Sequence, residues 1–253
     1  MPAIKQSICF NPFNSGDSTP EQLIAAAAKA GYKSVEMAPQ EHWPLIKDYG
    51  LDIAIVVGHG SLPDGLNKRE NHDRIENELL ANIDLAVAND ISSLICFSGN
   101  AEGKSSEEGL ANCVEGLRRV TAAAERNNIN LSMELLNSRV NHPDYQCDNT
   151  AWGVAMCRAV GSPRVNLLYD IYHMQIMEGD LIRKITDNVE YISHFHTAGN
   201  PGRQDLDDEQ EIYYPPIMKA IAASDYEGYV GHEYRPKGDA IASLEHAFSV
   251  CNA

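Results

Sequence analysis

Four side chains able to bind a metal ion stand at the ends of short apolar runs in the second half of the chain. These runs are Leu131-Ser-Met-Glu134, Leu167-Leu-Tyr-Asp170, His194-Phe-His196 and Gly231-His-Glu233. Carboxylates on apolar segments are costly to bury without a counter-charge, and a divalent cation is the simplest compensation. Three carboxylate oxygens and one imidazole nitrogen suit Mn²⁺ or Mg²⁺, with Co²⁺ as a further candidate, better than a metal that prefers thiolates. The sequence therefore predicts one divalent metal site.

Such a site would suit proton transfer next to a carbonyl group. A C–H bond in that position is too weak an acid to ionise at pH 7 unaided, and a metal on the carbonyl and adjacent hydroxyl oxygens stabilises the enediolate. One or two carboxylates must then remove and return the proton. Because Glu134 and Glu233 can flank a substrate, we expect isomerisation of a small hydroxy-carbonyl compound.

Each of these residues also has an ordinary structural interpretation. A glutamate at a strand end often pairs with a neighbouring Arg or Lys, and Asp170 can cap the helix that follows it. His194 and His196 alternate onto the same face, so one of them can be a hydrogen-bonded core histidine. The occurrence of metal-capable residues at four successive strand ends is what favours the metal site.

The apolar runs belong to a regular alternation of predicted strands and helices. The strands are short and rich in Val, Ile, Leu, Phe and Tyr, as strands buried on both faces should be. We expect them at Ile4–Phe10, Ser34–Met37, Asp52–Val57, Ser92–Phe97, Asn130–Leu135, Arg164–Tyr169, Tyr191–His196 and Gly228–Glu233.

Helical patterns lie between the predicted strands. The first opens with Thr19 and Pro20, a cap residue followed by proline at the first helical position, and it stops at Gly31. We expect helices at Thr19–Ala30, Asn71–Ala88, Ser106–Arg126, Thr150–Val160, Asp180–Thr186, Tyr214–Ala223 and Asp239–Val250.

Eight strand–helix units with no linker or compositional break predict an α/β fold, a (β/α)₈ TIM barrel forming one domain over residues 1–253. Active sites of such barrels lie at the C-terminal ends of the strands, where the four candidate ligands stand. The alternative is a doubly wound open sheet, which usually carries a Gly-rich phosphate loop after its first strand. Here that position is Phe10-Asn-Pro-Phe-Asn, without such a loop.

Composition limits the partners. The formal net charge of −16 argues against a nucleic-acid partner, which would need Lys and Arg to neutralise phosphates. No window approaches the roughly 18 apolar residues of a membrane span, and the first residues lack the layout of a signal peptide. The six cysteines form no CxxC pair, which indicates free thiols in a reducing compartment. We expect a cytoplasmic protein acting on a small molecule, with no membrane partner; a homo-oligomer is compatible with the sequence.

Several motifs together resemble the hydroxypyruvate isomerase family. They are Glu134-Leu-Leu-Asn, Leu168-Tyr-Asp170-Ile-Tyr-His173-Met-Gln, His194-Phe-His196 and Asn200-Pro-Gly-Arg203. This family is part of the xylose isomerase-like barrels, which include D-tagatose 3-epimerase and endonuclease IV. The resemblance is densest from about Ser132 to Glu233 and extends more weakly over the whole chain.

The resemblance implies roles for particular residues. Glu134, Asp170, His196 and Glu233 would bind the metal, and Glu134 and Glu233 would be the acid–base pair. His173 and Arg203 would contact the substrate. The implied reaction is the conversion of hydroxypyruvate to tartronate semialdehyde.

Two further residues are candidates for the substrate pocket. The planar fork of Arg203 suits a substrate carboxylate, although Arg203 can instead pair with Asp205 or Asp207 beside it. His59, after the third predicted strand, can line the pocket, or its flanking glycines can simply mark a turn. One segment departs from the family pattern: residues 204–211 are acidic and free of glycine where the family commonly has a Pro- and Gly-containing stretch, so the pattern does not predict the conformation of this loop. Within it, we expect the run Asp207–Glu209 to be a solvated loop.

Other functions remain open on the sequence alone. The same residues would serve a ketose 3-epimerase, or a lyase or decarboxylase that passes through the same enediolate. A repair nuclease like endonuclease IV needs a His-rich multi-zinc site and a basic groove, and the net charge of −16 disfavours it. A sugar-binding barrel without catalysis would be expected to have lost one of the two glutamates.

Overall fold

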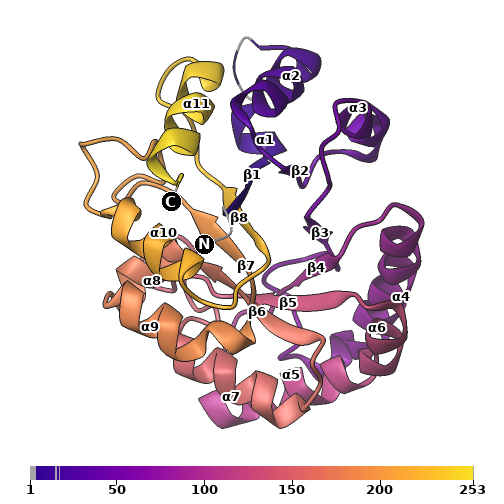
Figure 1. Cartoon of the computed structure of the whole chain (residues 1–253). Helices are drawn as coiled ribbons and strands as arrows, with labels where there is room; N and C mark the ends of the chain where they lie inside the picture. The colour runs from indigo at the N-terminus through magenta and orange to yellow at the C-terminus, as the bar shows by residue number, and fades with distance from the viewer. Residues whose placement is uncertain (1–3, 15, 17, 253) are drawn as a thin grey trace. The chain divides into compact units, whose positions relative to one another are not determined.

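The computed structural model describes residues 4–14, 16 and 18–252. Over these residues, eight strands alternate with helices along the chain (Figure 1). The strands are β1 (Lys5–Cys9), β2 (Ser34–Glu36), β3 (Ile55–Val57), β4 (Ser93–Cys96), β5 (Asn130–Glu134), β6 (Val165–Asp170), β7 (Ile192–Thr197) and β8 (Tyr229–His232). Their order in the sheet is β2-β1-β8-β7-β6-β5-β4-β3, and the strand pairs with a defined register are parallel. This is the strand–helix alternation of the predicted (β/α)₈ fold.

At least one α-helix follows each strand. The helices are α1 (Phe10–Phe13), α2 (Pro20–Ala30), α3 (Trp43–Asp48), α4 (His72–Ala88), α5 (Ser106–Arg118), α6 (Thr121–Asn127), α7 (Thr150–Val160), α8 (Ile171–Met177), α9 (Leu181–Asn188), α10 (Tyr214–Ala222) and α11 (Ala240–Val250). The start of α2 is a capping box, in which the Thr19 hydroxyl accepts from Gln22 N–H and the Gln22 side chain accepts from Thr19 N–H.

All eight strands lie where the sequence predicts them, with bounds that differ by three residues or fewer. One predicted helix is wrong as a single element, because Ser106–Arg126 divides into α5 and α6. The Thr121 hydroxyl bonds the Arg118 carbonyl there, an alternative to the regular helical ladder. The sequence analysis missed the short helices α1, α3 and α8, because four to seven residues are too few to show a helical period.

The chain packs into two compact units, which are described separately. The first holds the described residues up to Val56, with 180–190 and those from His194 onward, and the second holds 57–179 and 191–193. Strands β3 and β7 each begin in one unit and end in the other. The organisation as a single domain stays a prediction.

In the first unit, β1 lies between β2 and β8, and β8 pairs with β7. Cys9 is level with Glu36, Ser7 with Gly231, and His196 with Gly231. Gly231 lies between Ser7 and His196, and a Cβ at that position would collide with the carboxylate of Glu36, which starts two residues further along the sheet beside Cys9. The position therefore requires glycine, because the space that a side chain would fill is already taken.

In the second unit, β5 lies between β4 and β6. Leu131 is level with Val165, and Glu134 with Leu168. Leu131, Met133 and Leu167 are fully buried, which ties the strands to the core and fixes their register. The Tyr145 hydroxyl donates to the Glu134 carbonyl oxygen at 3.0 Å, holding the end of β5.

None of the described helices is both long and apolar enough to cross a lipid bilayer. All six cysteines are free and buried, as the scattered spacing predicts.

Candidate active site

The second unit supplies two carboxylates from neighbouring strand ends. Glu134 is the last residue of β5 and is 6% exposed, and Asp170 is the last residue of β6 and is 1% exposed. The Asp170 side chain also accepts from His173 N–H at 3.0 Å and so caps α8. The helix-capping role that the sequence allowed for Asp170 is therefore confirmed, and the oxygen that accepts this hydrogen bond is Oδ1. It fixes the orientation of the carboxylate at the start of the helix.

His173 lies beside Asp170, fully buried. Its Nδ1 accepts from the backbone N–H of Asn137 at 3.2 Å and also contacts the Asn137 side-chain amide. Because Nδ1 is an acceptor, the proton of the neutral ring is on Nε2, which lies 3.6 Å from Asp170 Oδ2. Asn137 thus sets the tautomer and the direction of this histidine.

The first unit supplies an imidazole and a third carboxylate. His196 is on β7, and Glu233 directly follows β8, where its N–H donates to the Thr197 carbonyl at 2.9 Å. This backbone bond brings the two side chains together. His196 Nδ1 lies 3.0 Å from Glu233 Oε2; His196 is fully buried, and the Glu233 side chain is 19% exposed.

Arg203 pairs with Glu233 and not with Asp205 or Asp207, while its binding of a substrate carboxylate stays a prediction. Its Nη2 donates to Glu233 Oε2 at 2.5 Å. Asp205 instead accepts from Ser243 and from the backbone N–H of Lys237, and Asp207 binds the Lys237 ammonium group. The Arg203 side chain is 27% exposed, and its guanidinium group lies beside a predicted catalytic carboxylate.

The run Asp207–Glu209, expected to be a solvated loop, is half-exposed at Asp207 and exposed at Asp208 and Glu209, and ion pairs hold two of its carboxylates. Lys237 Nζ lies 2.7 Å from Asp207 Oδ2 and 2.8 Å from Glu209 Oε2. These two ion pairs hold the pKa of Lys237 above its usual range. Contacts to the β8–α11 connection therefore fix the segment without the glycines that the family pattern would supply.

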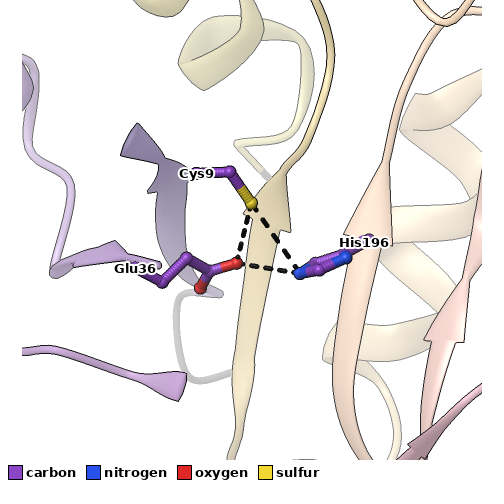
Figure 2. Close-up of side chains that lie close together, drawn as sticks. All are labelled: Cys9, Glu36 and His196. Carbon is purple, nitrogen blue, oxygen red and sulfur yellow. Dashed lines mark hydrogen bonds and ion pairs between the residues drawn. The ribbon is translucent and has the colours of Figure 1, made fainter. Parts of the chain in front are cut away.

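A glutamate that the sequence analysis did not select reaches the same histidine. Glu36, the last residue of β2, is fully buried and accepts from His196 Nε2 at 2.9 Å, while His194 Nε2 lies 3.1 Å from its other oxygen. The Cys9 thiol donates to Glu36 at 3.1 Å. Figure 2 shows Cys9, Glu36 and His196 pointing toward one another. The sequence could have indicated Glu36 as a site residue, because it is the last residue but one of the predicted strand Ser34–Met37.

Charge balance explains how Glu36 is tolerated there. Burial by itself would raise the pKa of Glu36, but the charge of His194 and hydrogen bonds from both histidines outweigh it and hold the pKa well below its usual range. Burial, followed by the negative charge of Glu36, raises the pKa of the Cys9 thiol. Cys9, Glu36 and His196 have potential ligand atoms within 4.8 Å of one another, yet their contacts are those of a hydrogen-bond network around one carboxylate.

His59 has a structural role. It is 1% exposed, its Nε2 accepts from Phe97 N–H at 2.9 Å, and its Nδ1 lies 3.1 Å from the Gly60 carbonyl, to which it donates. Burial lowers its pKa to about 4. Since the backbone occupies both ring nitrogens, we leave His59 out of the substrate contacts proposed below.

Comparison with known proteins places this geometry in a family. Residues 24–250 match the family model described as xylose isomerase-like TIM barrel. The chain belongs to this family. The match covers all of the candidate residues and Glu36. Cys9, which donates to Glu36, precedes the matched range.

Curated relatives of this barrel carry isomerase names. Hydroxypyruvate isomerase of Escherichia coli is 35% identical over 150 residues, covering 59% of this chain and 57% of that protein. A putative hydroxypyruvate isomerase of Danio rerio is 27% identical over 243 residues, covering 88% and 87%. The alignment with the human putative hydroxypyruvate isomerase, at 30% identity, spans 52% of this chain and only about half of that protein, 47%.

Solved structures agree on the fold. An AP endonuclease of family 2 from Brucella melitensis superposes with a TM-score of 0.83 at 24% identity, covering 100% of both chains. An L-ribulose 3-epimerase superposes with a TM-score of 0.79 at 19% identity, covering 98% of this chain and 93% of that one. At these identities the likeness shows the barrel fold, and the chemistry must be argued from side chains.

The structural role of His59 predicts a particular pH dependence. Its folded-state pKa of about 4 lies below the 6.5 of an ordinary histidine, so the unfolded chain takes up a proton first as the pH falls. The stabilisation is complete above pH 6.5 and is lost between pH 6.5 and 4. We expect protonation of His59 to lower the free energy of unfolding by roughly 2 kcal/mol between pH 7.5 and pH 5. The His59→Asn variant should not show this decrease.

Urea unfolding at pH 7.5 and pH 5 measures this difference, with His246→Asn, an exposed histidine of α11, as the matched control. A His59→Asn variant with the same pH dependence as the parent, but a raised KM, would instead favour the substrate contact suggested by the sequence.

Proposed function

We propose that this protein is an isomerase of small hydroxy-carbonyl acids that uses one divalent metal ion. The reaction we propose is hydroxypyruvate to tartronate semialdehyde. The observation that carries the proposal is the set of ligand-type side chains at the ends of β5, β6 and β7 and directly after β8, in a chain related to hydroxypyruvate and 2-oxo-tetronate isomerases.

The chemistry of the donor set fits a hard divalent cation. Glu134, Asp170, His196 and Glu233 each offer one ligand atom, giving three carboxylate oxygens and one imidazole nitrogen. Three carboxylates bring three negative charges to a region where Asp170 and Glu134 are nearly inaccessible to water. Such charges need compensation, and oxygen-rich sites prefer Mn²⁺ or Mg²⁺, with Co²⁺ tolerated.

When bound, a divalent cation would polarise the substrate carbonyl and stabilise the enediolate that proton loss creates. We assign the proton transfers to Glu134 and Glu233. One carboxylate removes the proton from carbon, and a carboxyl group returns it to the neighbouring carbon. Arg203 and His196 both contact Glu233 Oε2, which fixes the orientation of this carboxyl group.

We assign substrate recognition to Arg203 and His173. Arg203 is partly exposed beside Glu233, and a guanidinium group binds a carboxylate through two parallel hydrogen bonds. His173 presents Nε2–H next to Asp170, since Asn137 occupies Nδ1. An anionic substrate therefore explains why an acidic protein keeps this arginine at the site.

Metal content tests the donor set. Asp170→Ala should lose both the ion and the activity. Because Asp170 also caps α8, Asp170→Asn is the matched variant: its amide oxygen can keep the cap, but it lacks the negative charge. We expect elemental analysis to find about one ion per parent chain and clearly less in both variants, with helix content preserved in Asp170→Asn. Full activity of the parent in excess EDTA would refute metal dependence.

Isotope exchange tests the proton-transfer assignment. In D₂O, turnover should place deuterium on the carbon that receives the proton, because a carboxyl proton exposed to solvent exchanges before it is returned. Glu134→Gln and Glu233→Gln should keep some metal through the amide oxygen and lose kcat by at least about two orders of magnitude. NMR of the product measures both. A product free of deuterium, or a Gln variant with near-normal kcat, would exclude the corresponding role.

The Arg203→Ala variant distinguishes two roles of Arg203, binding the substrate carboxylate and orienting Glu233. Losing the carboxylate anchor should raise KM for a carboxylate substrate by about two to three orders of magnitude, the equivalent of roughly 3–4 kcal/mol. Losing the hydrogen bond to Glu233 should lower kcat for every substrate alike. Steady-state kinetics on hydroxypyruvate and on neutral ketoses distinguishes the two effects, with exposed Arg235→Ala as control. If a neutral hexose is the best substrate of the parent, a ketose 3-epimerase replaces the proposed isomerase.

A further inference from the structure

The buried carboxylate of Glu36 lies at the centre of a network in the first unit. It is fully buried and makes close contacts with His196 and Cys9 (Figure 2). It also contacts His194. None of these contacts is local in the sequence, since 160 positions separate Glu36 from His196 and 158 separate it from His194. The contacts of this carboxylate therefore form only when the strands of the first unit are assembled.

The sheet is built to let Glu36 reach His196. Glu36 is on β2 and His196 on β7, with β1 and β8 between them in the sheet. On β1, the residue level with Glu36 is Cys9, which has a small side chain, and on β8 the residue level with His196 is Gly231. A Cβ at Gly231 would occupy the place of Glu36 Oε1, so the glycine leaves the space that the carboxylate fills.

The hydrogen bond from His196 decides which ring nitrogen carries a proton. A carboxylate accepts hydrogen bonds and donates none, so His196 Nε2, 2.9 Å from Glu36 Oε1, is the protonated nitrogen. In the neutral ring, Nδ1 is then the nitrogen left for coordination, and it is the atom that lies 3.0 Å from Glu233 Oε2. The opposite tautomer would put a hydrogen on the nitrogen that faces the proposed ligand.

We propose that Glu36 is a positioning residue for His196, which fixes the Nε2–H tautomer and the ring orientation so that Nδ1 faces Glu233 and the metal. This inference rests on the proposed function for its metal, but the tautomer itself is a property of the metal-free chain. Carboxylates that accept the second N–H of a metal-binding histidine commonly change metal affinity by about 10- to 100-fold.

Two variants of one carboxylate contact test this role. Glu36→Gln replaces the acceptor with an amide of the same shape, whose NH₂ group can donate to Nε2 and drive the proton to Nδ1. Cys9→Ala is the matched control, because it removes the thiol, which contacts the same oxygen, Oε1, at 3.1 Å and His196 Nε2 at 3.8 Å, but leaves the carboxylate that accepts from the histidine in place. Circular dichroism and the urea midpoint establish that each variant folds.

Two measurements are made on each protein. Long-range ¹H–¹⁵N NMR of metal-free, ¹⁵N-histidine-labelled chain reports the His196 tautomer, with the signals assigned from His196→Asn. Free Mn²⁺, measured by electron paramagnetic resonance, gives the affinity. We expect Nε2–H in the parent and in Cys9→Ala, loss of this form in Glu36→Gln, and an affinity lower by about 10- to 100-fold in Glu36→Gln alone.

A Glu36→Gln variant that keeps the Nε2–H tautomer and binds Mn²⁺ within about twofold of the parent overturns the proposal. If Glu36→Gln does not fold, Glu36→Asp carries the test: it retains the charge but reaches less far, so it should bind Mn²⁺ more weakly than the parent, and parent-like affinity would overturn the role. A parent that binds no Mn²⁺ refutes the proposed function, while the tautomer measurement still decides the role of Glu36.

Discussion

An ionised carboxylate inside a protein must be surrounded by donors, and the centre of the first unit is arranged around that requirement. Glu36 is fully buried, and desolvating a charge without compensation costs several kcal/mol. His194, His196 and Cys9 supply the donors, and Gly231 supplies the room. An apolar core of the same volume would avoid this cost. The carboxylate is therefore best understood through what it does to His196, whose other nitrogen faces Glu233.

Parallel strands are an efficient way to bring such residues into register. The bond from Glu233 N–H to the Thr197 carbonyl aligns the residue after β8 with the end of β7, and the pairing of β5 with β6 sets Glu134 level with Leu168. His196 is then held by a rigid strand and by the Glu36 carboxylate. In the other unit, His173 on α8 is likewise oriented by a polar neighbour, Asn137.

The barrel fold is shared by relatives and structural neighbours whose names describe different reactions, including isomerases, epimerases and an AP endonuclease. What distinguishes this chain is its side chains. Here the net charge is −16, and Arg203 is held beside the partly exposed Glu233. So negative a net charge is poorly suited to binding a polyanion, which needs an extended positive surface.

The sequence by itself determined the strands, most of the helices and the four metal-capable residues, because alternation of apolar runs and the residue at each strand end are local properties. The long predicted helix at 106–126 failed where a threonine side chain competes with the backbone. Only the tertiary structure decided that Arg203 pairs with Glu233, that backbone groups occupy both ring nitrogens of His59, and that Glu36 reaches His196. These contacts depend on strand register, on side-chain direction and on space left by a glycine, and none of these has a signature in local periodicity.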